Sequence, residues 1–435
     1  SLVLSLLSRK ADPEFGRRDG YLVVATTWIV YCLFGMLPFL TGGVTDRVAV
    51  AFFEAMSGFT TTGASALDHI DGLPHSILFW RSLTHWIGGM GIIFFTLALL
   101  PALGVGEQQL FSAESTGLKL GKLHPRVSTT THWLWSTYLL VTVACALTYY
   151  LCGMNLFDAV NYSFATLATG GFATHGDSIA YFHSPLIEYA SVVFMMLSSI
   201  NFTLLYLLIF KRRWRQTLRD EEIRLYLFLV FLAVGIITLS KWLEAGDLSE
   251  HGFRESLFNV VSLMSTTGFT TENFLVWPPL TWIILLIMCV IGSCAGSTAG
   301  GIKVVRVLTA VKIIRNEFRR ILHPRAVLTL RINQDNLGPE VVQSIFAYTC
   351  FFILLLTIGV STLIIMGLPM FDALGLSISA YSNVGPGLGY EIGPLDSWSV
   401  LPDGGLYVTS ILMIAGRLEI FAFIIPFVPS FWREY

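Results

Sequence analysis

The stretch Ser265-Thr-Thr-Gly-Phe-Thr-Thr-Glu272 is rich in hydroxyl groups, yet it stands between apolar segments. Related stretches occur three more times in the chain: Thr60-Thr-Thr-Gly-Ala-Ser65, Ala168-Thr-Gly-Gly-Phe-Ala173 and Ser382-Asn-Val-Gly-Pro-Gly387. Each one follows a short helix-like run and precedes a long hydrophobic run. We expect the fold to be organised around these four turns.

The composition is that of an integral membrane protein. Of the 435 residues, 54% are hydrophobic and only 13% are charged, whereas a soluble globular domain carries about 25% charged residues. The apolar runs are continuous over helical lengths, as in 21–40, 187–210 and 225–239. Strands of an outer-membrane barrel would instead alternate in polarity. We therefore predict an all-α protein embedded in the lipid bilayer.

Charge and cysteine usage exclude several classes of function. The net charge of −2 offers no basic surface for nucleic acid. The six cysteines lie in or beside apolar runs, at spacings typical of neither a disulfide framework nor a zinc site. The nine histidines form no closely spaced ligand pair. We expect the cysteines to be packing residues and this chain to hold no cofactor.

Aligning Gly63, Gly171, Gly268 and Gly385 reveals an internal repeat. Each unit has a leading apolar run (21–41, 132–152, 223–243 and 342–367), a short run (48–59, 157–167, 255–265 and 372–382), the turn, and a trailing apolar run (76–101, 185–210, 278–316 and 404–431). The long runs can cross about 30 Å of hydrocarbon as helices, but the short runs cannot. The short runs are therefore predicted to be re-entrant, with turns that are buried in protein or face water.

These units define the expected domains. We predict four pseudo-repeats of transmembrane helix, re-entrant pore helix, filter loop and transmembrane helix around one central pore. The boundaries are an N-terminal cytoplasmic segment at 1–19, the remnant of a preceding helical region, and repeats at 20–127, 128–219, 220–333 and 334–435.

Three short runs carry an acid at the same offset before the aligned glycine: Asp158, Glu255 and Asp372. The first repeat has Val50 there, with Asp46 one helical turn earlier. We interpret these acids as caps that meet the positive end of the helix dipole. The alternative is a direct role in ion handling.

The basic residues predict the orientation in the membrane. Most of the 27 lysines and arginines lie in the segments 9–18, 119–126, 211–224 and 303–331. By the positive-inside rule these segments, and with them both termini, are cytoplasmic. The turns then open outward, on a side rich in aspartate and glutamate, where Arg47, Arg81, Lys241 and Arg254 are the basic residues. A negative outer vestibule would concentrate cations, although solvated loop charge alone could give the same bias.

The turns offer carbonyl oxygens rather than charged side chains. Glycine adopts left-handed backbone geometry without a steric penalty, so consecutive carbonyls can point toward one axis. Four such turns would form rings of oxygens that replace the water around an alkali cation. Apart from Glu272 at the end of the third stretch, the turns contain no carboxylate, which argues against a calcium or magnesium site.

With these motifs the chain resembles the superfamily of potassium transporters that includes TrkH, KtrB and the plant HKT proteins, and is most similar to the bacterial TrkH family. The resemblance covers the whole chain. It rests on the segments 53–63, His85-Trp-Ile-Gly-Gly-Met-Gly91, 100–106, 292–303 and Gly416-Arg-Leu-Glu-Ile-Phe421.

The resemblance implies a K⁺ filter formed by Thr61, Thr62 and Gly63; Thr169, Gly170 and Gly171; Thr266, Thr267 and Gly268; and Asn383, Val384 and Gly385. Members that favour sodium commonly have serine at the first aligned glycine, so Gly63 favours potassium, with rubidium as a surrogate. The fourth turn lacks threonine, so the ring is not fourfold equivalent.

The resemblance also implies partners and a location. These are a homodimer with one pore per protomer, and a cytoplasmic regulatory ring of the TrkA (RCK) type. That ring would bind the regulating nucleotide, ATP/ADP or NAD. The location would be the inner membrane of a bacterium.

The third trailing run is interrupted by Gly292-Ser-Cys-Ala-Gly-Ser-Thr-Ala-Gly-Gly301. Its glycines Gly292, Gly296, Gly300 and Gly301 argue against a continuous helix, and irregular backbone at mid-membrane belongs beside a cavity. We predict an intramembrane gate loop at 292–301. A close contact of small residues between helices is the alternative. A phosphate loop is disfavoured because the Gly-Lys-Ser/Thr ending is missing.

Arg417 lies inside an apolar run, where an arginine costs roughly 2.5–3.5 kcal/mol on insertion scales. It should therefore face the interior, and we predict that it acts with the gate loop as a positive barrier to cations. Pairing with Glu419 is the alternative, but residues two apart do not share a helix face.

We thus expect a potassium channel-like protein gated from the cytoplasm, with a symporter coupled to Na⁺ or H⁺ as the competing hypothesis. An enzyme is disfavoured, because His85, the one histidine well inside a predicted trailing helix, has no evident catalytic partner.

Overall fold

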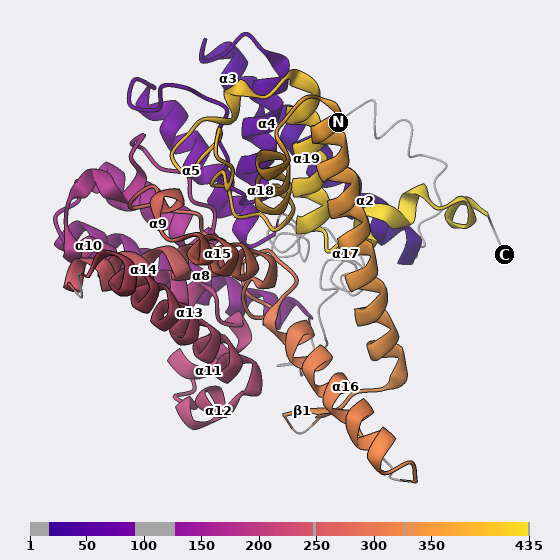
Figure 1. The fold of residues 1–435 in the computed structure, drawn as a ribbon. Helices are drawn as coiled ribbons and strands as arrows, with labels where there is room; N and C mark the ends of the chain where they lie inside the picture. Colours follow the sequence, from indigo (N-terminus) through magenta and orange to yellow (C-terminus); the bar gives the residue numbers. More distant parts are fainter. Residues whose placement is uncertain (1–16, 92–126, 247–248, 326–327, 334, 434–435) are drawn as a thin grey trace.

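The computed structural model describes residues 17–91, 127–246, 249–325, 328–333 and 335–433. Over these residues the protein is helical, as the sequence predicts (Figure 1). The described part contains one pair of short strands, β1 (Arg331–Ile332) and β2 (Asp335–Asn336), which are antiparallel. The predicted segment 1–19 falls almost entirely outside the described residues.

The four leading runs form long helices: α2 (Arg17–Gly35) with its continuation α3 (Leu37–Thr41), α8 (Val127–Leu151), α13 (Glu221–Ala245) and α17 (Pro339–Ile365). By length and composition, each of the four is able to cross a membrane. Their outer faces expose large apolar side chains, and Leu151 and Ile365 are 75% and 84% exposed. A face of this kind would be unstable in water but suits the hydrocarbon of a bilayer.

The four short runs form helices α4 (Val48–Phe59), α9 (Leu156–Ala168), α14 (Glu250–Met264) and α18 (Met370–Tyr381). The acids predicted as caps do not cap them. Asn155 caps α9 and Ser249 caps α14, each by accepting a hydrogen bond from a backbone N–H in the first turn. The capping expectation was wrong because the carboxylates of Asp158 and Asp372 reach other segments and Glu255 lies beyond the first turn of α14. Asp158 and Asp372 do lie in the first turns of their helices, near the positive end of the dipole as expected.

The trailing runs are the largest correction to the predicted helices. Only the third was expected to break, yet the second and fourth bend as well. α10 (Pro185–Ser198) meets α11 (Phe202–Ile209) at 108°, and α19 (Asp403–Arg417) meets α20 (Phe421–Ile424) and the following turn at 118°. The third run gives α15 (Pro279–Ile291) and α16 (Val304–Leu322), and the first gives α5 (His75–Gly89), beyond which residues 92–126 are not described.

The helices are packed in a closed cyclic order. Each short helix lies against the trailing helix of the repeat before it: α9 against α5, α14 against α10, α18 against α15, and α4 against α19. The last pair joins the two ends of the chain and closes the ring. One buried core fills the junction of the first and fourth repeats, and a second fills that of the second and third.

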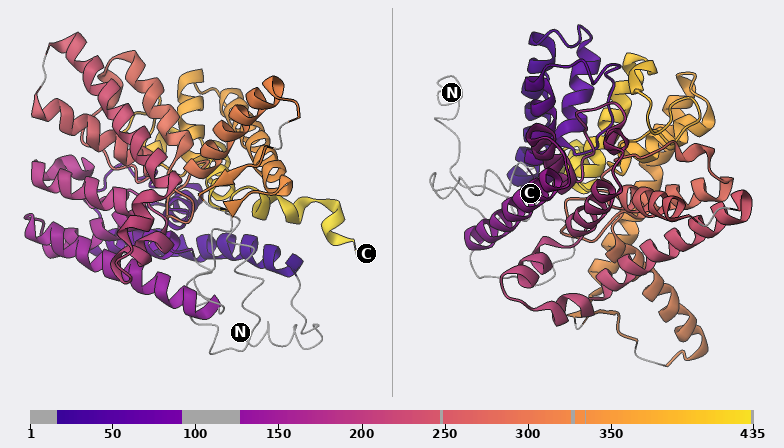
Figure 2. Two further views of the ribbon diagram at one scale, coloured as in Figure 1. Left: turned by 90° about the horizontal axis from the view of Figure 1, so that it is seen from below. Right: turned by 90° about the vertical axis from the view of Figure 1, so that its left-hand side faces the viewer.

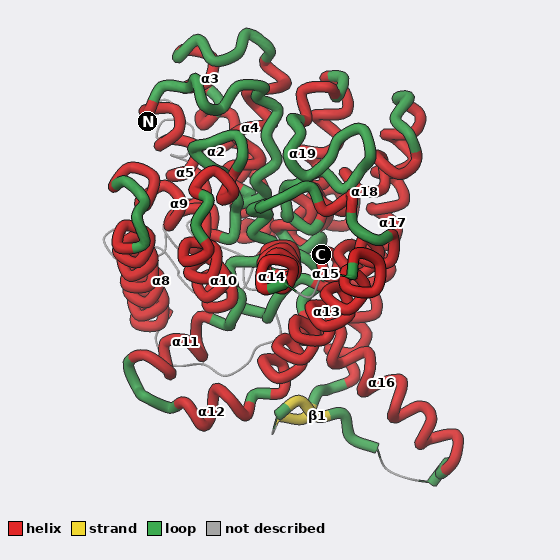
Figure 3. Tube along the Cα trace, turned by 60° about the vertical axis from the view of Figure 1, so that its left-hand side comes forward, coloured by secondary structure: helices red, strands yellow, loops and turns green. Residues whose placement is uncertain are grey.

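The two ends of the molecule differ. In Figure 3 the loops gather at the end that holds the short helices and their turns, whereas α11, α12 (Trp214–Arg219) and α16 lie at the opposite end. The segments that leave the turns contain short 3₁₀ helices at Ser178–Phe182, Phe274–Val276 and Trp398–Val400. After α20, the chain passes α2 and leaves the bundle through two more 3₁₀ turns, Ile425–Phe427 and Pro429–Trp432 (Figure 2).

Candidate ion-binding site

The four turns share one backbone conformation. Thr61, Thr169, Thr266 and Asn383 all have φ 54, in the left-handed region. The next N–H in each turn donates to a carbonyl five residues back, as from Thr62 to Ser57 at 2.9 Å. Left-handed geometry costs a residue with a side chain roughly 1–2 kcal/mol. Its occurrence in all four turns shows that the surrounding structure imposes it.

The aligned glycines close the turns into a ring. All four have positive φ, as predicted. A Cβ on Gly63 would overlap the carbonyl oxygen of Gly170 in the next turn. The same relation joins Gly171 to the Thr267 carbonyl, Gly268 to the Val384 carbonyl, and Gly385 to the Thr62 carbonyl. Each carbonyl thus lies against the glycine of its neighbour, and the structure brings together all twelve predicted site residues. We call this arrangement the turn ring.

The side chains of the turns are buried and form hydrogen bonds with one another. In the first turn Thr60 and Thr62 share a hydroxyl contact of 2.8 Å, and Ser265 and Thr267 do the same in the third. In the fourth turn the amide of Asn383 donates to the Thr62 hydroxyl at 3.0 Å and to the Met413 carbonyl at 2.9 Å. The fourth turn therefore has the same backbone conformation as the other three, although it lacks threonine.

The acids of the short helices bind the segments that leave the turns. Asp158 accepts from the Thr174 hydroxyl at 2.6 Å, and Asp372 accepts from the backbone N–H groups of Glu391 and Ile392 at 2.9 and 3.0 Å. In the first repeat Glu54 does this work, through Ser65 and Ala66. Glu54 was not predicted from the sequence. It stands one helical turn after Val50, a displacement that an alignment on glycine does not reveal.

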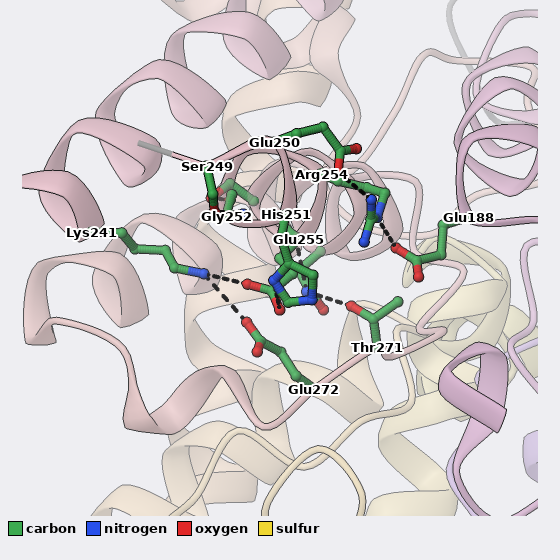
Figure 4. Close-up of polar contacts among 12 residues, drawn as sticks. Glu188, Lys241, Ser249, Glu250, His251, Gly252, Arg254, Glu255, Thr271 and Glu272 are labelled. Carbon is green, nitrogen blue, oxygen red and sulfur yellow. Dashed lines mark hydrogen bonds and ion pairs between the residues drawn. The ribbon is translucent and has the colours of Figure 1, made fainter. Parts of the chain in front are cut away.

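In the third repeat the acids form an outer cluster (Figure 4). The Lys241 ammonium group lies 2.7 Å from a Glu255 oxygen and 3.4 Å from a Glu272 oxygen. His251 lies 3.0 Å from the other oxygen of Glu255. Burial, with the neighbouring Glu255 carboxyl, raises the pKa of Glu272 to about 7, although Lys241 opposes the shift. All four basic residues predicted on this side are paired with acids: Arg47, Arg81, Lys241 and Arg254.

The loop 292–301 lies against the ends of three short helices. The Ser293 hydroxyl donates to the Met264 carbonyl at 2.8 Å, and the Thr298 hydroxyl donates to the Leu167 carbonyl at 3.0 Å. A Cβ on Gly300 would overlap the Ser382 carbonyl. These contacts place the loop directly beneath the turn ring.

Two further contacts connect the glycines of this loop to their surroundings. The Gly300 N–H donates to the Thr266 hydroxyl, a member of the turn ring, at 2.7 Å. The Gly296 carbonyl accepts from Phe202 at 3.0 Å. At the ends of the loop, a Cβ on Gly292 would lie 3.1 Å from the Gly301 Cα. The predicted gate glycines therefore gather in one folded loop rather than along a helix face.

Arg417 joins this loop to α5. One guanidinium nitrogen donates to the Thr298 carbonyl at 2.6 Å, and the other donates to the Gly88 and Gly89 carbonyls at 2.5 and 3.1 Å. The positive charge thus meets the negative end of the α5 dipole. The carboxylate of Glu419 pairs with Arg306. The residues predicted for the gate therefore lie together.

Glu222 is a second residue that the sequence analysis missed. It is 2% exposed, at the start of α13, and one of its oxygens accepts from the N–H groups of Ala295 at 2.7 Å and Val305 at 3.1 Å. It therefore holds the loop near its start and the first turn of α16, which follows the loop. The signal was an acid at the start of an apolar helix already capped by Asp220.

Comparison with known proteins identifies the family. Residues 2–434 match the model of the TrkH family, described as cation transport proteins. The TrkH potassium uptake protein of Escherichia coli K12 is 38% identical over 436 residues, which cover 98% of this chain and 88% of that protein. The chain belongs to the TrkH family.

Other TrkH relatives agree. The protein from Halomonas elongata is 38% identical, over 99% of this chain and 89% of that protein. The crystal structure of the potassium transporter TrkH from Vibrio parahaemolyticus matches with a TM-score of 0.85 at 36% identity, over 98% of this chain and 88% of the other. Membership of a cation transporter family makes the chain a multi-pass membrane protein and not an enzyme.

Some of the residues on which the predictions rest are not among those that the structure describes, and the prediction for the cysteines is met in part. The family motif at 100–106 and the basic residues Lys119, Lys122 and Arg126 are not among the described residues. Among the described residues, no group of three or more histidine, cysteine, aspartate or glutamate side chains could hold a metal ion. Four of the six cysteines are buried, Cys152 is partly buried and Cys350 is exposed.

Proposed function

We propose that the chain is a channel-like pathway for potassium, selective at the turn ring and moving K⁺ down its electrochemical gradient. The observation that carries the proposal is the cyclic contact of the four carbonyls with the four glycines. Backbone oxygens arranged around an axis can replace the hydration shell of K⁺. The TrkH relatives are named as potassium uptake proteins, which supports K⁺ as the transported ion.

The electrostatics of the site favour a monovalent cation. The short helices end at the turn ring, so the negative ends of their dipoles point toward it. The twelve ring residues include no carboxylate, and calcium and magnesium sites usually contain carboxylates. The acidic outer face adds a field that attracts cations.

We further propose that the loop 292–301 closes the pathway. It is bonded to Thr266 above and to Arg417 below, so its removal from beneath the ring requires these bonds to break. Arg417 adds a fixed positive charge near the path, which raises a barrier to cations. A movement of α5, α13 or α19 would be transmitted to the loop through Gly88, Glu222 or Arg417.

The remaining expectations are proposals that rest on the family resemblance. We propose a homodimer in the bacterial inner membrane with cytoplasmic termini. A regulatory ring would dock on the basic segments 211–224 and 303–331, and its bound nucleotide would control the gate. The basic, amphipathic α16 lies at the end of the bundle opposite the turns, where such a ring would bind (Figure 3).

A symporter is the second candidate. A coupled transporter needs an ionisable residue at mid-membrane depth, and buried Glu222 and Lys303 lie beside the loop in addition to Arg417 and Glu419. Current through the purified protein separates the two. A reversal potential that follows the K⁺ gradient alone supports a channel, and a shift with an imposed Na⁺ or H⁺ gradient supports symport.

Uptake of ⁸⁶Rb⁺ into proteoliposomes tests the proposed function. We expect K⁺ to inhibit uptake at far lower concentration than Na⁺ or Li⁺, because Gly63 stands where members of the superfamily that favour sodium commonly have serine. Equal inhibition by K⁺ and Na⁺ would contradict the proposed function. So would uptake by vesicles containing the gate variant Arg417→Ala that does not exceed uptake by empty vesicles.

A further inference from the structure

His85 of α5 supports the turn of the next repeat from behind. Its ring stacks on Phe172 with the centroids 4.1 Å apart. A Cβ on Gly170 would overlap the ring. Because the Gly170 carbonyl lies against Gly63 on its other side, this peptide is held between the imidazole and the first turn. His85 is completely buried.

The hydrogen bonds of His85 define its tautomer. Its Nδ1 donates to the Gly58 carbonyl at 2.7 Å, because a carbonyl can only accept. Its Nε2 accepts from the Phe172 N–H at 3.1 Å. The imidazole is therefore neutral, with its proton on Nδ1. One side chain thus links the end of the first short helix to the second turn.

Arg81, one helical turn earlier on the same face of α5, strengthens this link. Its guanidinium donates to Glu54 at 3.3 Å, to the Ser65 hydroxyl at 3.1 Å and to the Ala173 carbonyl at 3.2 Å. It also lies 4.1 Å from the centroid of the Phe172 ring. The segments that leave the first and second turns are therefore joined through the buried Arg81 side chain, which also pairs with Glu54.

The described contacts at the other three junctions of the ring are different. The Thr270 N–H donates to the Ser178 hydroxyl at 3.3 Å, the Trp282 indole donates to the Leu388 carbonyl at 2.9 Å, and the Trp398 N–H donates to the Ser65 carbonyl at 2.8 Å. These bonds at the turns join neutral groups. Ion pairs also connect these repeats, Arg254 with Glu188 and Arg47 with Asp403, but they join the ends of helices rather than the turns. The junction of the first two repeats thus has a support of its own, and it lies behind Gly170, the residue that replaces threonine or valine in the middle of the second turn.

We propose that His85, supported by Arg81, is a positioning residue that fixes the Gly170 carbonyl and thereby contributes to the K⁺ over Na⁺ preference. The inference rests on the proposed function of the turn ring. A middle glycine has no side chain to anchor it, so the imidazole supplies the rigidity that packed side chains supply in the other turns. Without that support the carbonyl can move toward the axis and coordinate a smaller ion.

Two isosteric variants separate the two bonds of His85. In His85→Asn the amide nitrogen can take the place of Nδ1 and keep the donor to Gly58, but the acceptor for Phe172 is lost. In His85→Gln the amide oxygen can take the place of Nε2 and keep that acceptor. The readout is the ratio of the Na⁺ and K⁺ concentrations that halve ⁸⁶Rb⁺ uptake, which does not depend on the amount of active protein.

We expect the ratio to fall at least about fivefold in His85→Asn, the factor for the loss of one typical hydrogen bond, and to stay near the parent value in His85→Gln. Trp86→Phe is the matched control, since Trp86 is adjacent on α5 and donates to Thr142 of α8 rather than to the ring. We expect no change in its ratio.

The outcomes distinguish this inference from the proposed function. A selective parent with equally selective Asn and Gln variants overturns the role of His85 alone. A parent without K⁺ preference contradicts the proposed function, and the inference with it. If His85→Asn gives no uptake, His85→Phe, which keeps the stacked ring and loses both bonds, replaces it, and an unchanged ratio there overturns the inference.

Discussion

The four repeats are alike in the turn ring but differ in the layer beneath it, which is formed by the ends of the trailing helices and the loop 292–301. In the ring, four turns of different sequence have the same backbone, with φ 54 at Thr61, Thr169, Thr266 and Asn383. In the layer beneath, the second and fourth trailing helices bend sharply, whereas the third continues into the loop 292–301. Among the described residues, a loop of this kind follows the trailing helix of the third repeat and not those of the second and fourth.

This difference follows from what each layer has to do. An ion that has lost its water must be surrounded by oxygens from all sides, so the same carbonyl geometry is required four times. A barrier needs one segment across the path. The third repeat can therefore differ from the others below the ring without disturbing the ring. Thr266 connects the two layers, because its backbone has the conformation shared by the four turns and its hydroxyl accepts the hydrogen bond from Gly300.

The ring is tested most severely at Gly63. In Gly63→Ser the new Cβ would overlap the Gly170 carbonyl, and the residue would be strained at φ 85. We expect the preference for K⁺ over Na⁺ in ⁸⁶Rb⁺ uptake to fall by at least about tenfold, which corresponds to about 1.4 kcal/mol. Gly43→Ser is the control, because Gly43 also has positive φ but has open space around it. Unchanged selectivity in Gly63→Ser would count against the ring as the filter.

The layer beneath is tested at Arg417. In Arg417→Ala the bonds to Thr298 and Gly88 and the positive charge are all lost. We expect ⁸⁶Rb⁺ uptake to rise about fivefold, with selectivity unchanged, since one or more hydrogen bonds of about 1 kcal/mol no longer hold the loop. Arg417→Lys should give a smaller rise, because it keeps the charge but lacks the planar fork.

Arg47→Ala is the control for this experiment. Arg47 is also paired, with Asp403, but lies among exposed groups on the outer face, so we expect no change. Uptake in Arg417→Ala equal to that of the parent would remove the gate assignment and leave Arg417 as a cap for α5.

The connection between the layers is tested at Thr266. In Thr266→Val the shape is kept but the hydrogen bond from the buried Gly300 N–H is lost, which costs the closed loop about 0.5–1 kcal/mol net. We expect a rise in uptake of a few-fold, smaller than in Arg417→Ala because the other bonds of the loop remain. Thr169→Val is matched in position and in φ, and its hydroxyl donates to Ala168 in its own turn. Equal uptake in the two variants would show that ring and loop are independent.

The smallest effect concerns the outer cluster of the third repeat. The pKa of Glu272 is raised to about 7 by burial and by Glu255, so its carboxylate is charged above pH 7 and neutral below it. At low ionic strength we expect uptake to be higher at pH 8 than at pH 6 by less than about twofold, because one outer charge is screened within a Debye length.

The same pKa has a consequence for stability. A carboxyl with a raised folded-state pKa destabilises the folded protein as pH rises through the window from its unfolded value to about 7. Glu272→Gln should therefore be stabilised relative to the parent at pH 8 and not at pH 5, as thermal unfolding in detergent can measure. A difference between parent and variant that does not depend on pH would show that the carboxyl does not titrate in this range.

The sequence predicted the long leading helices and the short helices well, because hydropathy and length alone separate a spanning helix from a re-entrant one. It did not predict the bends after Ser198 and Arg417. Both lie in apolar runs, and the hydropathy of a run does not change when the helix turns sideways within the bundle. In the second run, Asn201, which caps α11 through its side chain, was the one local signal.

The parts of the candidate site that repeat could be predicted from the sequence, whereas the residues that occur in one repeat could not. Four turns aligned on glycine reveal each other, and the family resemblance then names the twelve ring residues. Glu54 is displaced by one helical turn from the acids of the other repeats, whereas His85 and Glu222 occur once and have partners that are distant in the chain, as with His85 and Phe172. A single polar residue in an apolar helix gives no indication of which segment it will meet.

Anomalous diffraction from crystals grown in Rb⁺ tests the central claim most directly. We predict a peak on the axis of the turn ring, between the carbonyl oxygens of Thr62, Gly170, Thr267 and Val384, and a much weaker peak when Na⁺ is in excess. Rb⁺ peaks elsewhere in the protein, with none inside the ring, would contradict it.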